Sequence, residues 1–184
     1  MPNISGHMAV AKRVSEILGI DSDDFYRGNL LPDLYEDKIK SHYKVKGELF
    51  YIPDIEEAKK NLNLKDLNDL GVLSHLLLDK YYFGEYLKDN SFFRDKSIYK
   101  DYDIINKDIV KYFDLDVERI INSFKHFKED ILTSKLDVNI RCIQLNEGGI
   151  TKYLDKDDFI RFLEESSERI ANEIINLKRE DLWN

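Results

Sequence analysis

The amino-acid sequence predicts an all-α fold, a single-domain bundle of several helices. Its 184 residues include only three prolines, so long helical segments are rarely interrupted. Few runs alternate apolar and polar residues as half-buried strands do, and Leu, Ile, Lys and Glu are abundant. At most one short hairpin is expected, near residues 42–52.

The first part of the chain carries helix boundaries that the residue types make visible. A first helix is expected over residues 7–18 and ends at Gly19. A second helix begins near Asp21 and fades where Gly28 and Pro32 interrupt its pattern.

The rest of the chain alternates helices with connections. Residues 41–53 are the candidate hairpin or an irregular excursion, and Pro53 then opens a helix from the first-turn position that proline favours. Residues 89–103 lack a clear period and are expected to form a surface connection. Helices are expected at 53–62, 65–88, 104–113, 116–133 and 156–178.

Composition limits the class of protein. The chain is 42% hydrophobic and 35% charged, which is typical of a globular protein. Its net charge of −8, without a block of Lys and Arg, argues against duplex nucleic acid as a partner. A single cysteine, Cys142, allows no internal disulfide. Because no segment resembles a signal peptide or reaches the ~18 apolar residues of a membrane span, we expect no transmembrane segment and a cytoplasmic protein.

Two of the four histidines lie on helix faces that should point inward. His7 shares its side of the first helix with Val10 and Val14. In the apolar stretch LGVLSHLLLD, residues 70–79, His75 and Asp79 lie one turn apart on one face. A buried carboxylate must be paired or ligated, so either an internal ion pair or a metal ion would satisfy Asp79.

The other candidates are weak when taken singly. His42 reads as a loop histidine and Asp33 as a capping aspartate. His126 and Asp130 repeat the four-residue spacing, but the helical wheel places His126 on the solvent side of its helix. Spacing therefore indicates a metal site only where it falls on a buried face.

In their order along the chain, GHMAVA, RGNLLPD, SHY and LGVLSHLLLD resemble the zinc-dependent phospholipase C family, which shares its helical fold with fungal single-strand nucleases. The likeness covers about residues 5–85 and extends to small bacterial hydrolase-like proteins. It implies that four residues surround one zinc ion: Asp33, His42, His75 and Asp79. It also implies that Asp79 bridges to a second metal held by His7, and that Asp33 orients or deprotonates a water.

Two imidazoles and two carboxylates suit zinc, and iron, manganese or nickel could also bind. The family's third zinc needs two later histidines and a glutamate, whereas only His126 follows His75, so we expect one or two ions. The family's N-terminal tryptophan ligand is also expected to be missing, because the chain starts Met-Pro-Asn. The metal-site half is expected within residues 1–88, with peripheral helices over 104–184.

The leading functional hypothesis is a metal-dependent hydrolase that cleaves a small phosphoester or phospholipid-like substrate with a metal-activated water. One alternative, a phosphohydrolase of the HD-domain type, is disfavoured because the chain has no His-Asp dipeptide. The other is a structural or binding domain that keeps a metal, or a buried His–Asp network, without turnover. Tyr82 and Tyr86 are expected near the site, and Arg27 and Lys80 are candidate phosphate contacts.

Overall fold

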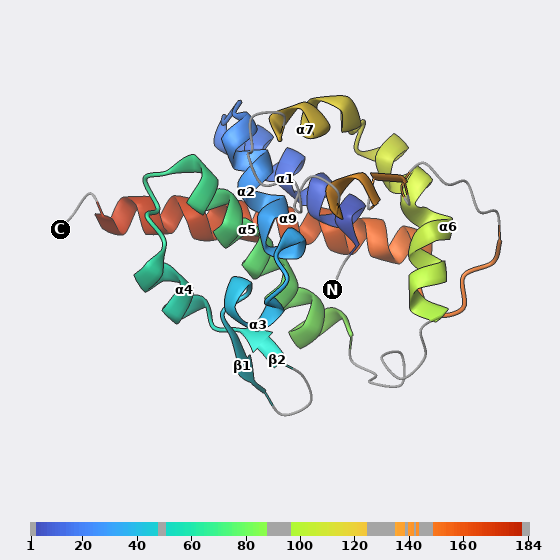
Figure 1. The fold of residues 1–184 in the computed structure, drawn as a ribbon, viewed down its shortest axis with the longest axis horizontal. Helices are drawn as coiled ribbons and strands as arrows, with labels where there is room; N and C mark the ends of the chain where they lie inside the picture. Colours follow the sequence, from blue (N-terminus) through green and yellow to red (C-terminus); the bar gives the residue numbers. More distant parts are fainter. Residues whose placement is uncertain are drawn as a thin grey trace.

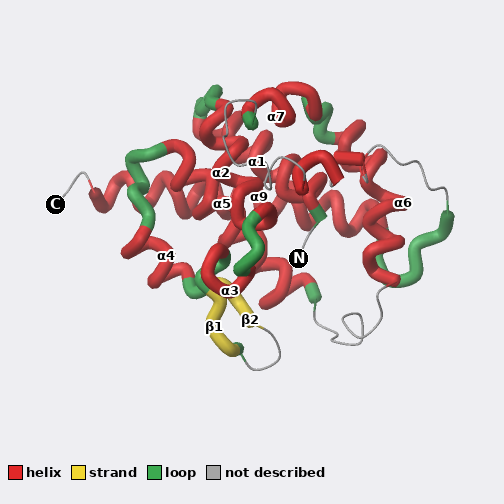
Figure 2. Tube along the Cα trace, viewed as in Figure 1, coloured by secondary structure: helices red, strands yellow, loops and turns green. Residues whose placement is uncertain are grey.

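The computed structural model describes residues 3–47, 51–87, 97–124, 135–138, 140, 141, 143 and 149–181. Helices dominate these residues, together with one two-stranded antiparallel hairpin, which confirms the predicted all-α class (Figure 1, Figure 2). The elements in chain order are α1 (Ile4–Leu18), α2 (Asp23–Leu34), α3 (Lys38–Ser41), β1 (Lys44–Lys46), β2 (Tyr51–Pro53), α4 (Ile55–Asn61), α5 (Leu67–Tyr81), the π-helix η1 (Tyr82–Tyr86), α6 (Ser97–Tyr112), α7 (Val117–Ser123) and α9 (Lys156–Asp181).

The first helix ends where the sequence predicts. Gly19 adopts the left-handed conformation, with φ of 65°, that commonly closes a helix. The helix begins three residues earlier than predicted, at Ile4, because the Asn3 side chain caps it by accepting from the Gly6 N–H. His7 therefore lies in the second turn of α1, with its side chain buried as predicted.

Helix α2 continues through Gly28 and Pro32, so the predicted interruption is wrong. Gly28 of α2 and Gly71 of α5 instead allow these two helices to cross closely. A Cβ atom on Gly28 would lie 1.9 Å from the backbone oxygen of Asn68, and one on Gly71 would lie 2.2 Å from that of Phe25. Only glycine allows two backbones to approach this closely. The crossing brings residues 25–29 of α2 against residues 68–71 of α5.

Helix α5 forms the centre of the fold. Five of its six leucines are at most 1% exposed, namely Leu70, Leu73, Leu76, Leu77 and Leu78. The helix contacts α1, α2, α4, β2 and α9, as its nearly all-round apolar sequence predicts. In Figure 1, α9 spans most of the length of the molecule, and it packs against α1 and α5.

The hairpin predicted between residues 41 and 53 is confirmed. Strands β1 and β2 are antiparallel, with Val45 opposite Ile52 and Lys46 opposite Tyr51. Pro53 is the last residue of β2 rather than the first residue of a helix, so that part of the prediction is wrong. Helix α4 begins after Asp54, whose side chain accepts from the Glu57 N–H and caps the helix.

The later helices differ more from expectation. Helix α6 starts at Ser97, so the predicted surface connection is wrong for residues 97–103, while residues 88–96 lie outside the described part of the chain. Asp101 helps to explain this error, because it is a charged residue that is nevertheless buried in the helix. Its carboxylate accepts three backbone N–H groups from residues 152–154. Helix α7 covers the start of the predicted 116–133 helix, and residues 125–133 are not described. Helix α9 confirms the predicted last helix.

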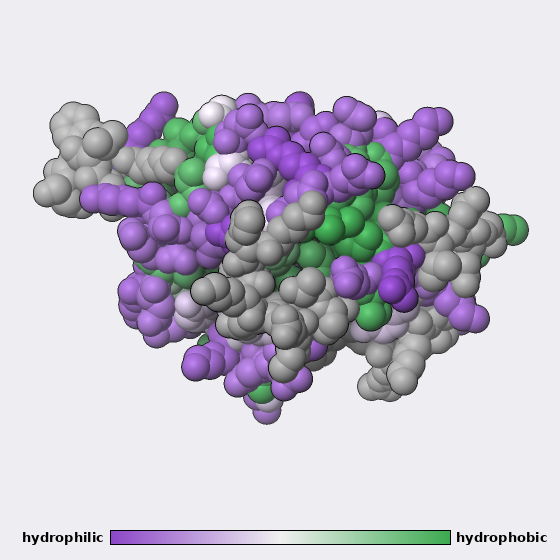
Figure 3. All heavy atoms as spheres, turned by 45° about the horizontal axis from the view of Figure 1, so that its top comes forward, coloured by the Kyte–Doolittle hydropathy of each residue, from purple (hydrophilic) through white to green (hydrophobic). Residues whose placement is uncertain are grey.

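Hydrophilic residues predominate on the face of the molecule that Figure 3 shows, with hydrophobic surface in smaller areas between them. Among the residues that the structure describes, no helix is both long enough and apolar enough to cross a membrane.

Candidate metal centre

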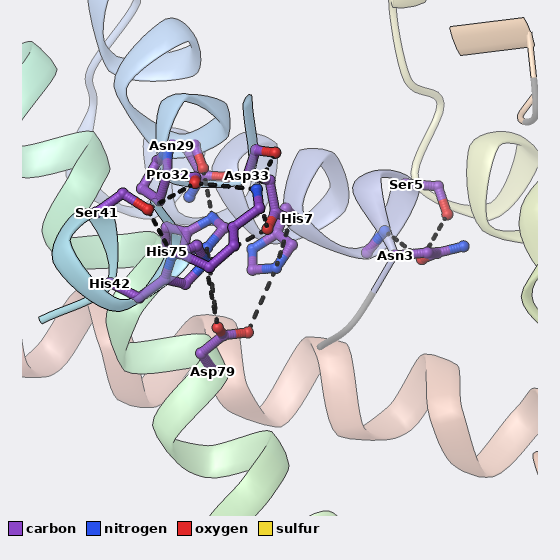
Figure 4. A network of polar contacts seen from close by, with 12 residues as sticks. Asn3, Ser5, His7, Asn29, Pro32, Asp33, Ser41, His42, His75 and Asp79 are labelled. Atoms are coloured by element: carbon purple, nitrogen blue, oxygen red, sulfur yellow. Dashed lines mark hydrogen bonds and ion pairs between the residues drawn. The ribbon is translucent and has the colours of Figure 1, made fainter. Parts of the chain in front are cut away.

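Five polar side chains from four parts of the chain meet inside the molecule. His7 comes from α1, Asp33 from the last turn of α2, His42 from the residue after α3, and His75 and Asp79 from α5. Figure 4 shows the three imidazole rings gathered between Asp33 on one side and Asp79 on the other. The structure thus brings together all five residues that the sequence singled out.

This cluster is almost completely buried. The three histidines and Asp79 are 0% exposed, and the Asp33 side chain is 11% exposed. Carboxylates are rarely found at such depth without a partner, because removal from water disfavours their charged form. Asp33 forms the only edge of the cluster that solvent reaches in the described part of the molecule.

The first group of atoms surrounds the Nε2 atom of His42. That atom lies 3.2 Å from His75 Nε2, 3.3 Å from Asp33 Oδ1 and 3.7 Å from Asp79 Oδ2. His75 Nε2 lies 3.9 Å from the same Asp79 oxygen. Ligand atoms bound tetrahedrally to zinc, with bonds of ~2.0–2.2 Å, lie about 3.4 Å from one another. The distances from His42 Nε2 to the other three atoms are therefore close to the spacing between ligands of a tetrahedral ion.

The remaining carboxylate oxygens face His7. Its Nε2 atom lies 3.6 Å from Asp79 Oδ1 and 3.8 Å from Asp33 Oδ2. The His7 ring stacks on the His75 ring, with 3.8 Å between the centroids and 10° between the planes. Each carboxylate thus points one oxygen toward His42 and the other toward His7. The placement of ligand atoms allows a metal ion to be held by His7, His75 and Asp79 or by Asp33, His42 and His75.

Hydrogen bonds fix which nitrogen of two rings is free to bind a metal. The Nδ1–H of His75 donates to the backbone oxygen of Asn29 at 2.7 Å, which leaves Nε2 of the neutral ring as an acceptor. The Ser41 hydroxyl donates its hydrogen to Pro32 O at 3.0 Å, so it accepts from His42 Nδ1 at 2.9 Å. His42 Nε2 is then also an acceptor. Such contacts at the second ring nitrogen are typical of histidines that ligate metals.

The cluster consequently contains more acceptors than donors. The His7 ring supplies an N–H and Lys38 Nζ lies 3.7 Å from Asp33 Oδ1, yet several acceptor atoms have no partner. Hydrogen-bond partners are missing for both nitrogens of His7, both carboxylate oxygens of Asp79 and Oδ1 of Asp33. An ordinary ion pair or hydrogen-bonded network would place a proton between these atoms at shorter distances. A cation fits the arrangement better, since it accepts lone pairs from every side.

The electrostatics keep the groups in the states that metal ligands need. Burial lowers the pKa of His75 to about 3, with a further lowering by His7, so the ring is neutral at ordinary pH. Burial alone would raise the pKa of Asp33, but the interactions with His42, His75 and His7 outweigh it and hold the pKa well below its usual range. Burial alone would also raise the pKa of Asp79, but its interactions with His7 and His75 outweigh burial and hold the pKa below its usual range.

Supporting residues were missed by sequence reasoning. Lys38 Nζ donates to the backbone oxygens of Pro32 and Asp33 and lies 3.7 Å from Asp33 Oδ1, so it holds the end of α2 and its carboxylate together. Ser41, which precedes His42, was visible as part of SHY but had no predicted role. The contact between Asn29 and His75 joins residues 46 positions apart, and no local pattern indicates it.

Of the other predicted neighbours, Tyr82 lies close enough to the cluster for Asp79, after burial, to raise the pKa of its hydroxyl. The rings of Tyr82 and Tyr86 stack on each other and pack against Phe159 and Phe162, and the Tyr82 hydroxyl contacts that of Tyr102. Arg27 pairs with Asp24 and donates to Ser123 O. Lys80 is exposed on α5. His126 and Asp130 lie outside the described residues, so the predicted absence of a third metal remains a prediction.

Comparison of the chain with known family models, with curated proteins and with solved structures found no match.

Proposed function

We propose that this protein is a metal-dependent hydrolase of phosphoesters, with one or two zinc ions held by His7, Asp33, His42, His75 and Asp79. One observation carries the proposal: two carboxylates and three imidazoles converge inside the molecule, and most of the acceptor atoms that face one another there have no hydrogen-bond partner. The nitrogen and oxygen donor set suits zinc, and iron, manganese or nickel are compatible with it.

The distances suggest how the five residues would divide between two ions. His42, His75 and one oxygen from each carboxylate would hold the first ion, while His7 and the other two oxygens would contribute to the second. Both aspartates would then bridge. Bound zinc would lower the pKa of a water at the site and withdraw charge from a phosphoryl oxygen.

The chain's own residues would supply orientation and access. Asp33 is the partly exposed member of the cluster, so substrate would approach from its side. Its carboxylate is ionised at neutral pH and can accept a hydrogen bond from the attacking water. Lys38 fixes the position of that carboxylate. Asn29 and Ser41 keep the Nε2 atoms of His75 and His42 directed into the site.

A second candidate function is a metal-binding domain without turnover. The observation in its favour is the burial of four of the five residues, which leaves substrate a narrow approach. The two functions predict the same metal content and differ only in catalysis.

The test is hydrolysis of bis(p-nitrophenyl) phosphate and p-nitrophenyl phosphate by chelator-treated protein, with and without added zinc. The hydrolase proposal predicts turnover that zinc restores, with kcat lowered roughly 100-fold or more in Asp33→Asn. Asp101→Asn is the matched control, because Asp101 is 2% exposed and its carboxylate accepts backbone N–H groups of residues 152–154, which do not belong to the cluster. Zinc-loaded wild type without turnover on either substrate would support the binding domain instead.

A further inference from the structure

The edge of the cluster that solvent reaches carries a lysine. Lys38 is the first residue of α3, and its side chain is 38% exposed where that of Asp33 is 11% exposed. Its Nζ atom lies 3.7 Å from Asp33 Oδ1, which in turn lies 3.3 Å from His42 Nε2. Among the lysines and arginines that the structure describes, Lys38 alone pairs with a carboxylate of the cluster. A molecule that reaches the metal centre past Asp33 therefore passes this ammonium group.

Two of the three ammonium N–H groups of Lys38 have acceptors in the backbone. They donate to the carbonyl oxygens of Pro32 and Asp33 at the end of α2, two residues that Figure 4 shows side by side. Asp33 Oδ1 is too distant for a hydrogen bond from the third N–H, and that oxygen has no hydrogen-bond partner. The backbone contacts thus fix the ammonium group in place, while its remaining N–H can donate to a bound molecule.

Asp33, and neither of the two acids that precede Lys38 in sequence, balances the charge of Lys38. Glu36 lies 3.8 Å from Lys135, and Asp37 accepts from backbone N–H groups of α3. Burial lowers the pKa of Lys38, and Asp33 opposes that shift and favours the charged form. Once a metal ion in the cluster offsets the charge of Asp33, the ammonium group can attract a second anion.

We propose that Lys38 binds a non-bridging oxygen of the substrate phosphate and thereby favours phosphomonoesters over phosphodiesters. The inference rests on the proposed hydrolase function and names the substrate class of the same site. Lysine is a common phosphate ligand, because its ammonium group presents a compact charge to the oxygens. The position beside Asp33 places that charge at the edge from which substrate would approach.

The preference for monoesters follows from charge. A phosphomonoester carries about two negative charges at pH 8, because its second pKa is about 6, whereas a phosphodiester carries a single charge. Coulomb energy is proportional to the product of the charges, so Lys38 attracts the monoester about twice as strongly. A contact made to substrate and transition state alike lowers KM and leaves kcat nearly unchanged. A lysine that only held Asp33 in place would instead affect both substrate classes equally and would act on kcat.

The first test measures anion binding without turnover. Isothermal titration calorimetry at pH 8 gives the Kd of inorganic phosphate and of dimethyl phosphate for zinc-loaded protein freed of excess zinc. In Lys38→Gln, the Kd should rise roughly tenfold for inorganic phosphate and roughly threefold for dimethyl phosphate. Lys38→Arg should restore most of the affinity, because it keeps the charge.

The second test separates KM from kcat. Lys38→Gln should raise KM roughly tenfold for p-nitrophenyl phosphate and roughly threefold for bis(p-nitrophenyl) phosphate, with kcat nearly constant. Lys40→Gln is the matched control, because Lys40 is exposed on the same short helix and the variant removes the same charge without the contact to Asp33. This control should match the wild type in both tests, and circular dichroism should show the same fold for every variant.

The outcomes separate this inference from the proposed function. Wild-type phosphate affinity in Lys38→Gln overturns the inference. Equal losses for the two anions, or loss of bound zinc in that variant, also overturn it, because Lys38 would then only support Asp33. Zinc-loaded wild type without turnover would refute the hydrolase alone, since the Kd values for phosphate decide the role of Lys38 by themselves. A wild type that binds no zinc would refute both.

Discussion

The Nε2 atoms of His42 and His75 lie 3.2 Å apart, although the hydrogen bonds of both Nδ1 atoms leave each Nε2 as an acceptor. Two lone pairs at this distance repel each other unless a proton or a metal ion lies between them. Because burial opposes protonation of His75, the arrangement favours the ion. The metal-free cluster should therefore be costly to the fold.

The first prediction concerns that cost. Zinc at about 100 times its Kd should raise the free energy of unfolding of the wild type by about 2.7 kcal/mol, and Asp79→Asn should lose most of that gain, because Oδ2 lies 3.7 and 3.9 Å from the two Nε2 atoms. Urea denaturation with zinc and in a chelator measures the change. Asp101→Asn should keep the gain, because the Asp101 oxygens accept backbone N–H groups of residues 152–154 instead. Equal gains in the two variants would mean that Asp79 is an ordinary structural carboxylate.

The second prediction concerns pH. The unfolded chain protonates His75 at its ordinary pKa of 6.5, whereas the folded chain does so at about 3. The unfolded state therefore binds more protons between these values, and metal-free stability falls as the pH drops through that window. From about pH 7 to about pH 5 the loss from His75 is about 2 kcal/mol.

Asp33 and Asp79 act in a lower window, because their pKa values are held below the usual 3.8. The stability they contribute is present above 3.8 and disappears only as the pH falls through the lower folded values. Urea denaturation in a chelator at about pH 7 and about pH 5 measures the effect of His75 alone, because both values lie above the window of the two aspartates. His75→Gln should reduce the difference, and an unchanged pH dependence in that variant would contradict the assignment to His75.

The third prediction concerns the hydroxyl that orients His42. Ser41→Ala should lower zinc affinity by roughly 10–100-fold without unfolding the protein, because His42 Nδ1 loses the partner that keeps Nε2 free. Competition with a zinc-binding dye measures it, and Ser41→Thr should retain affinity. The matched control is Ser167→Ala, whose buried hydroxyl donates to Leu163 O far from the cluster in sequence. Wild-type affinity in Ser41→Ala would show that another contact orients the ring.

The fourth prediction concerns the helix crossing that supports the cluster. A Cβ atom on Gly71 would lie 2.2 Å from Phe25 O and 2.7 Å from Asn29 N, and both are backbone atoms of α2. Gly71→Ala should therefore cost about 3 kcal/mol of stability and weaken zinc binding through displacement of Asn29 from His75. Gly84→Ala meets no atom within 4 Å and should change stability by about 0.5 kcal/mol or less. Thermal unfolding of both variants, with and without zinc, compares them.

Much of the site could be predicted because its residues lie on regular helices. The burial of His7, His75 and Asp79 follows from the apolar residues that share their faces, and the structure places them accordingly. The helical class and the hairpin follow from patterns of the same local kind. His42 and Asp33 carry no such local signal, and only their order relative to the other three residues indicated them.

The remaining features depend on contacts between distant segments. The sequence indicates Gly28 as an interruption of its helix and assigns no role to Gly71, whereas both allow the close approach of α2 and α5. Asp101 reads as a solvent-facing residue until the backbone of residues 152–154 is seen to donate to it. The tautomers of His42 and His75 likewise follow from Ser41 and Asn29, which the helical period cannot place.

The metal content of the protein, purified without added metal and then equilibrated with zinc, tests the account most directly. Inductively coupled plasma mass spectrometry should find one or two zinc equivalents in the wild type and in Asp101→Asn. His75→Ala and Asp79→Ala should lose them while circular dichroism still shows a helical fold. A folded wild type that retains no divalent metal after dialysis would contradict the account, and the cluster would then be a buried His–Asp network without an ion.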